Sequence, residues 1–205
     1  MRHAFRLVEN DYDYDLLTAV TAYLDCEHYA WLHGRNYSHY EILEDGPTTS
    51  QIVQHSKYLG ITFRQRHFRE YIPPSEFRMF SDKPFPIRTH TRFTARPDGG
   101  VHRTVDVAID VPLVLWPFRR LMEAHLRRYD ARVYAEDAAA AARRERYLGK
   151  NNWAWAFRPT QFLLHKDAVV EAFRDQIHRR PAELSPEPKR AANGHEPLER
   201  ALVER

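Results

Sequence analysis

Residues 87–111 read IRTHTRFTARPDGGVHRTVDVAIDV, two runs of alternating side chains joined by the turn sequence PDGG. Strict alternation of this kind is typical of antiparallel strands with one covered face and one wetter face. The positions expected on the covered face are Thr89, Thr91, Phe93, Val105, Val107 and Ile109. The pair of strands therefore predicts an antiparallel sheet with one face covered.

Four further runs of β-type composition lead up to this pair. They are YSHYEILED (37–45), TSQIVQHSKYLG (49–60), ITFRQRHFREYI (61–72) and EFRMFSD (76–82). Glycine and proline separate the runs, so six successive strands predict a meander. At the N-terminus, residues 3–9 predict a short first strand, and apolar residues at helical spacing predict a helical segment over about residues 15–33.

A long helical run follows Pro112 and includes five consecutive alanines, the residue with the highest helix propensity, before Gly149 ends it. The order of strand, helix, six-stranded meander and long helix over residues 3–149 resembles the α+β helix-grip architecture of START-like, Bet v 1-like and polyketide-cyclase-like proteins. That resemblance implies a curved antiparallel sheet wrapped around the last helix, with a cavity between them.

Three segments are expected along the chain. Residues 1–149 are expected to form the helix-grip domain, and the aromatic stretch 150–179 an extension packed on its outside, ending in a short helix. Residues 180–205 are rich in Pro, Glu, Arg and Asn, which bury too little apolar surface to become ordered, so we expect a flexible tail.

Composition excludes several classes of function. The 205 residues carry a net charge of only +3, mixed in sign, which argues against nucleic acid as the partner. One cysteine, Cys26, excludes an intramolecular disulfide and an iron–sulfur cluster held by this chain alone. The sequence has neither an apolar span of about 18 residues nor a secretory leader, so we expect a cytoplasmic protein without a membrane partner. Glycine-rich phosphate loops and a G-x-S-x-G nucleophile motif are also absent from the sequence.

The stretch DCEHYAWLH (25–33) has the pattern D-x-x-H-x-x-x-x-H. At about 100° per residue, His28 and His33 would lie about 140° apart around a regular helix. They would converge on one ion only if the helix were distorted or ended between them. The alternative is that both histidines lie on a polar helix face.

The same stretch resembles the iron-binding segment of the catalytic domain of Rieske-type aromatic-ring oxygenases, itself a helix-grip fold. The resemblance implies that His28 and His33 are imidazole ligands and that Asp25 is a carboxylate that orients a ligand and relays electrons. It implies a third ligand on the long helix, where Asp137 matches, with Glu136 beside it and Asp130 as the alternative. Iron(II) is the implied metal, and zinc is the alternative in purified protein.

The chain departs from that family because it cannot build the [2Fe–2S] cluster, which needs two cysteines and two histidines. Electrons would have to come from a separate ferredoxin-like chain, and a homo-oligomer is compatible with transfer across a subunit boundary.

The expected substrate is a mid-sized apolar molecule, aromatic, polyketide or terpenoid, in an apolar cavity with few polar groups. Aromatic residues on the wall elements are the candidates for lining it: Phe63, Phe68, Phe77, Phe80, Phe93, Trp116 and Tyr134. The strand histidines are interpreted as solvated or hydrogen-bonded side chains: His39, His55, His67, His90 and His102.

Three functions remain open at this point. The leading hypothesis is a mononuclear non-haem iron oxygenase-like enzyme. The second is a metal-free helix-grip ligand-binding protein or polyketide cyclase. The third is an accessory oxygenase subunit with a structural role.

Overall fold

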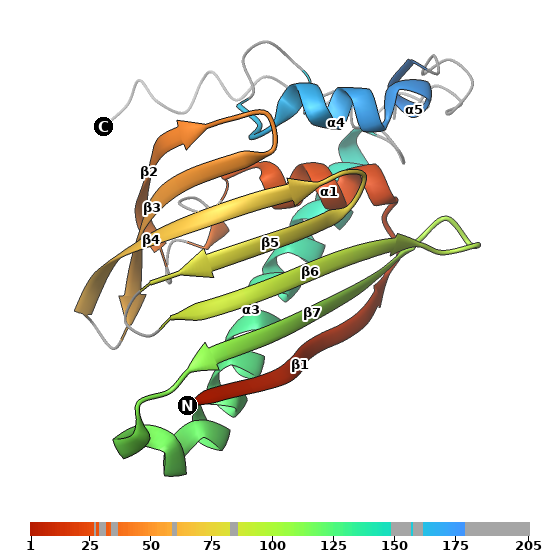
Figure 1. Ribbon diagram of the computed structural model, residues 1–205. Helices are drawn as coiled ribbons and strands as arrows, with labels where there is room; N and C mark the ends of the chain where they lie inside the picture. The colour runs from red at the N-terminus through yellow and green to blue at the C-terminus, as the bar shows by residue number, and fades with distance from the viewer. Residues whose placement is uncertain are drawn as a thin grey trace, which may run out of the picture.

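The described residues form one curved antiparallel sheet of seven strands, with a long helix across its concave face (Figure 1). This computed structural model describes residues 1–26, 28, 32–33, 37–58, 61–82, 86–148, 157 and 162–178. The strands are β1 (Arg2–Tyr12), β2 (Tyr37–Asp45), β3 (Thr49–Tyr58), β4 (Ile61–Ile72), β5 (Glu76–Ser81), β6 (Ile87–Ala95) and β7 (Val101–Asp110). Their order is β1-β7-β6-β5-β4-β3-β2, so the predicted meander is confirmed and β1 joins it beside β7.

The turn between β6 and β7 depends on two glycines. Gly99 has φ +86°, a left-handed conformation that glycine adopts without steric penalty. A Cβ on Gly100 would lie 2.5 Å from the backbone oxygen of Tyr12, at the end of β1. Gly100 therefore lets the turn approach the neighbouring edge strand closely.

Helix α1 (Leu16–Leu24) is shorter than the predicted helical segment. Asp15 caps its start by accepting a hydrogen bond from the Thr18 amide at 2.9 Å. At its other end Asp25 adopts an extended conformation, with φ −76° and ψ 90°. The predicted helical segment over about 15–33 is therefore interrupted after Leu24, and both His28, which is helical, and His33 come after the interruption.

Helix α3 (Arg119–Leu148) follows the short 3₁₀ helix η1 (Leu113–Phe118) and lies across the concave face of the sheet. Near its start, His3 of β1 and Glu123 are joined by a hydrogen bond of 2.9 Å. Farther along, Arg103 of β7 donates to both carboxylate oxygens of Asp130, at 3.2 and 3.0 Å. Arg103 is only 2% exposed, so this ion pair connects helix and sheet inside the protein.

Helices α4 (Lys166–Ala172) and α5 (Arg174–His178) lie beside α1 (Figure 1). Leu164, Val169 and Phe173 belong to the same buried cluster as the apolar side chains of α1. The Leu164 amide also donates to the carbonyl of Leu24 at 3.3 Å. The predicted tail, 180–205, lies outside the described residues, as does most of 149–161.

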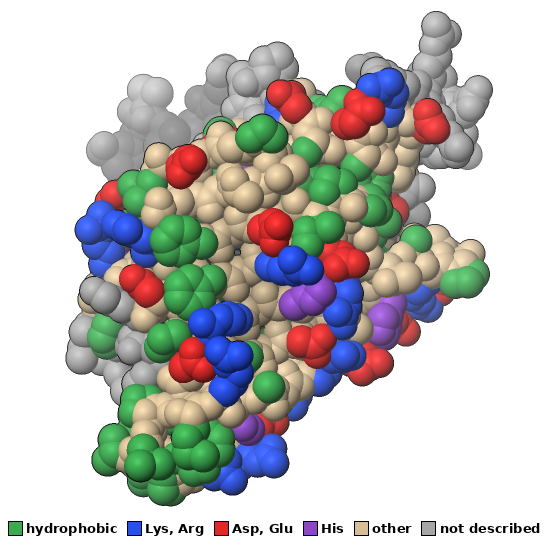
Figure 2. Space-filling model, viewed as in Figure 1, with side chains coloured by type: hydrophobic (Ala, Val, Ile, Leu, Met, Phe, Trp, Pro, Cys, Tyr) green, Lys and Arg blue, Asp and Glu red, His purple; other side chains and the backbone are tan. Residues whose placement is uncertain are grey.

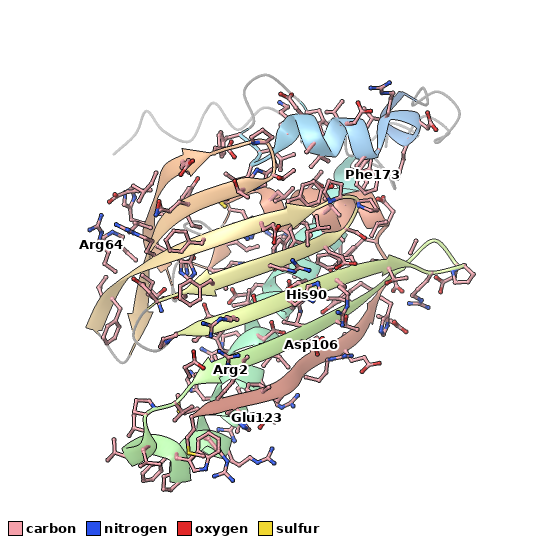
Figure 3. All side chains as sticks on the ribbon, in the orientation of Figure 1. Arg2, Arg64, His90, Asp106, Glu123 and Phe173 are labelled. Atoms are coloured by element: carbon pink, nitrogen blue, oxygen red, sulfur yellow. The ribbon has the colours of Figure 1, made fainter. Side chains whose placement is uncertain are left out.

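The outer face of the sheet carries arginine, acidic and histidine side chains side by side (Figure 2). His90 on β6 and Asp106 on β7 are paired in register on this face (Figure 3). Across the described part of the chain, no helix combines the length and apolar character needed to cross a bilayer.

Arg103→Ala is expected to lower the free energy of unfolding by about 3 kcal/mol, because the largely buried carboxylate of Asp130 would lose its partner. Urea denaturation followed by circular dichroism measures this change. The double variant Arg103→Met/Asp130→Leu should recover most of the loss. Arg2→Ala, which removes an exposed ion pair with Asp110, is the control and should leave stability nearly unchanged. Equal stability of Arg103→Ala and wild type would contradict the assigned role of the pair.

Candidate metal centre and cavity

A cavity of about 800 Å³ lies between the concave face and α3. Three of the predicted aromatic residues line it: Phe63 on β4, Phe93 on β6 and Tyr134 on α3. Most of the remaining wall is apolar, with polar side chains from β3, β4 and β5 grouped on the sheet. A volume of this size accommodates a mid-sized organic ligand.

The other four aromatic residues lie elsewhere. Phe68 and Phe80 pair in register on the outer face, with ring centroids 6.1 Å apart, so their prediction as lining residues is wrong. The reason is the two-residue period of a strand: Phe68 is five positions from Phe63, and an odd separation places them on opposite faces. Phe77 is a core residue against Tyr23, and Trp116 packs on the apolar cluster around β7.

His28, His33 and Asp137 converge where α3 passes the segment after α1. Each offers one ligand atom, and these three atoms lie within 4.8 Å of one another. Asp137 Oδ1 is 3.0 Å from His33 Nε2 and 3.6 Å from His28 Nε2. Asp130 is not part of this group, because Arg103 holds it two helical turns earlier.

Glu136 holds the other side of the His33 ring. Its Oε2 lies 2.6 Å from His33 Nδ1, and an ionised carboxylate can only accept, so Nδ1 is the donor. Burial lowers the pKa of His33, but the hydrogen bonds to Asp137 and Glu136 outweigh it and raise that pKa above its usual value. In the neutral ring, Nε2 is therefore the unprotonated nitrogen, and it faces Asp137.

His28 has the opposite electrostatic balance. Burial lowers its pKa to about 4, against the attraction of Asp137 and a hydrogen bond to the backbone of Asp25. His28 is thus a neutral imidazole at pH 7, the form that binds metals.

Two of the three separations can be compared with those expected around one metal ion. Two atoms bound at about 2.1 Å to one ion, at 90–110° to each other, lie roughly 3.0–3.4 Å apart. The separations of 3.0 and 3.6 Å from Asp137 Oδ1 are close to this range. Without a proton on His33, two acceptor atoms face each other at 3.0 Å, and a cation between them would remove the repulsion.

The segment that carries Asp25 is fixed to the sheet by Arg69. This buried arginine on β4 donates to Cys26 Sγ at 3.0 Å and to the carbonyl of Tyr23 at 3.3 Å. Burial raises the pKa of the Cys26 thiol, so it remains protonated. Asp25 itself is buried, 7% exposed, and its backbone accepts a hydrogen bond from His28.

Sequence reasoning assigned no function to Glu136, Arg69 or His67. Glu136 was noted only as the neighbour of Asp137. His67 on β4 was interpreted as solvated or hydrogen-bonded, which is wrong: it is 6% exposed, and neither ring nitrogen has a hydrogen-bond partner among the described residues. No sequence signal distinguishes Arg69 and His67 from the other residues of β4, because both faces of that strand carry polar residues.

Comparisons with known proteins identify the fold. No protein-family profile matches the sequence, and no curated protein is detectably similar to it. The aromatase/cyclase Zhui from Streptomyces sp. R1128 superposes with a TM-score of 0.61 at 14% identity, over 73% of this chain and 99% of that one. A START superfamily protein from Mycobacterium smegmatis superposes with a TM-score of 0.51 at 12% identity, over 68% and 98%.

Dicamba monooxygenase bound to 3,6-dichlorosalicylic acid superposes with a TM-score of 0.58 at 17% identity, over 85% of this chain. This chain spans only 58% of that oxygenase. At these identities the comparisons show the fold alone. The predicted helix-grip fold is confirmed, and its structural neighbours are START-like proteins that include an oxygenase and a cyclase.

Acid is expected to destabilise the metal-free protein between about pH 6.5 and pH 4. Over that interval the unfolded chain protonates His28, whereas the folded protein, with the His28 pKa at about 4, does not, so stability falls as pH falls. His28→Gln should reduce this fall by about 3 kcal/mol. Urea denaturation at a series of pH values, in the presence of a chelator, measures it. Identical pH profiles for the variant and wild type would contradict the assigned environment of His28.

Proposed function

We propose that this protein is a mononuclear non-haem iron oxygenase-like enzyme that acts on a mid-sized apolar substrate in the helix-grip cavity. One observation carries the proposal: two histidines and one aspartate converge at a point where His28 and Asp137 also line the cavity. Two imidazoles and one carboxylate on one side of an ion, with open positions opposite, are the ligand set of non-haem iron(II) oxygenases.

Iron(II) at these residues would supply the redox chemistry of oxygen activation, whereas zinc would supply Lewis-acid chemistry. The side chains have separable tasks around it. His28 offers a neutral nitrogen, Glu136 fixes the orientation of His33, and Asp137 lowers the net charge of the site. The apolar cavity wall excludes water and orients the substrate.

Asp25 is proposed as the carboxylate through which electrons reach the site. It is buried between the end of α1 and His28. Since one cysteine cannot hold a cluster, the electrons would come from a separate ferredoxin-like chain.

A metal-free cyclase or ligand-binding protein is the second candidate. It is supported by the cavity itself and by the superposition on 99% of the Zhui aromatase/cyclase, compared with 58% of the oxygenase. In that case Asp25, His28 or a nearby tyrosine would do acid–base chemistry without a metal. Metal content separates the two candidates.

Protein purified without chelator and loaded anaerobically with iron(II) is expected to bind one ion per chain, measured by elemental analysis. His33→Ala should lose stoichiometric metal, because it removes one ligand and the contact with Glu136. His90→Ala is the matched control, since that histidine lies on the outer face of the sheet (Figure 3). Bound iron should also raise the melting temperature of wild type but not of His33→Ala. Full metal content in His33→Ala would locate the site elsewhere.

Turnover is expected to need both oxygen and a ferredoxin with its reductase. Asp25→Asn is nearly isosteric and should keep the metal and the fold, yet slow reduction of the ferric site by at least about tenfold. Electron paramagnetic resonance of rapidly frozen samples measures that rate. Equal rates in the variant and wild type would defeat the relay assignment. Substrate conversion without oxygen or reductant would favour a cyclase or another non-redox enzyme.

A further inference from the structure

His67 is a buried polar side chain that the proposed metal centre does not use. It lies on β4 and lines the cavity, on the same face of the strand as Phe63 and Arg69. The side chain is 6% exposed, and neither Nδ1 nor Nε2 has a hydrogen-bond partner in the described part of the chain. Buried polar atoms are nearly always hydrogen-bonded, so two such atoms on one cavity-lining ring require an explanation.

The register partners of His67 on the neighbouring strands are uncharged, and Arg69 is the charged residue of β4 that lines the cavity near it. Ser81 of β5 and Ile52 of β3 are its register partners on either side, and both line the cavity. Two residues along β3 from Ile52, Gln54 donates a hydrogen bond to Ser56 Oγ at 3.2 Å, and Ser56 donates one to Gln65 Oε1 on β4 at 2.7 Å. These residues form a neutral hydrogen-bonding part of the cavity wall, whereas Arg69, Arg103 and Asp130 contribute charged groups elsewhere on the lining.

We infer that the substrate is an apolar molecule carrying an uncharged hydroxyl or ketone group, and that His67 is the residue that recognises this group. The inference rests on the proposed function in taking the cavity as the substrate site. A neutral imidazole has one N–H donor and one nitrogen acceptor, so it can both donate to and accept from a hydroxyl. A half-turn of the ring about its Cβ–Cγ bond exchanges each nitrogen with a carbon and so offers either edge to the cavity.

The charged groups near His67 favour its neutral form. Burial and the nearby Arg69 together lower the His67 pKa to about 4, against the attraction of Asp82. Arg69 is engaged with Cys26 and the Tyr23 carbonyl, and its guanidinium lies 5.1 Å from the centre of the Tyr23 ring. An uncharged polar group therefore matches this wall better than a carboxylate.

The position of His67 also orients the substrate. Arg69, two residues along the same face of β4, holds the segment that leads to His28. Alternate residues of a strand are separated by about 6.6 Å. His67 therefore lies farther than Arg69 from the segment that leads to His28. A substrate held by its polar group at His67 would extend its apolar part toward Asp137 and His28.

The test compares three fluorescent probes of one shape on the full chain: 2-naphthol, naphthalene and 2-naphthoate. Wild type is expected to bind 2-naphthol roughly tenfold more tightly than naphthalene, and more tightly than 2-naphthoate. His67→Leu, which keeps the volume but removes both nitrogens, should abolish the preference while keeping naphthalene affinity. His67→Gln keeps a donor and an acceptor and should retain most of the preference. His90→Leu on the outer face is the matched control.

Several results would overturn the inference. Equal wild-type affinity for 2-naphthol and naphthalene would do so, as would an unchanged preference in His67→Leu, tighter binding of 2-naphthoate, or no binding of any probe. If His67→Leu does not fold, the wild-type preference and His67→Gln decide the outcome. Metal content measured on the same samples tests the proposed function separately, because probe discrimination at His67 requires no metal.

Discussion

The ion pair between Arg103 and Asp130, together with the hydrogen bond between His3 and Glu123, fixes where α3 lies on the sheet. A helix that crosses a curved apolar face by contacts between aliphatic side chains alone can rotate or slide at small energetic cost. A bidentate pair inside the protein permits one arrangement, because any other leaves a charge buried without its partner. From Asp130, seven residues advance the helix about 10.5 Å and return to nearly the same face. Asp137 therefore points to the side of α3 that Asp130 occupies, and it meets the two histidines there.

Much of the architecture was predictable because alternation is a local property. The unbroken pattern of β7 shows in its sequence and in its burial, where every second residue is buried from Val101 to Ile109. The prediction that His28, His33 and Asp137 converge came from family resemblance. The periodicity of a regular helix alone would place the two histidines about 140° apart around the axis. The break after Leu24 precedes both histidines, and Arg69 contacts the chain on either side of it, at Tyr23 and Cys26, through tertiary contacts that no local pattern reports. The face on which Phe68 lies could be predicted by counting from Phe63, but which face was concave could not, because β4 has polar residues on both sides.

The cavity is chemically asymmetric along its length. His28 and Asp137 line it and form one group with His33. The sheet wall carries neutral amide, hydroxyl and imidazole groups, with the charged side chains of Arg69 and Arg103 also on it, and much of the remaining surface is apolar. A ligand that satisfies the neutral groups is fixed in direction as well as in place. Orientation of this kind contributes to rate by holding the reacting atoms near each other before the reaction begins.

The two histidines lie on the connection after α1, outside the ladder of hydrogen bonds that builds the sheet. A substitution at His28 or His33 removes one member of the converging group and touches no strand pairing and neither residue of the Arg103–Asp130 pair. The group of three converging side chains and the cavity are therefore separable by mutation. A single codon change can remove one member of the group while the scaffold and its cavity are kept, and the reverse change can restore it without altering the scaffold.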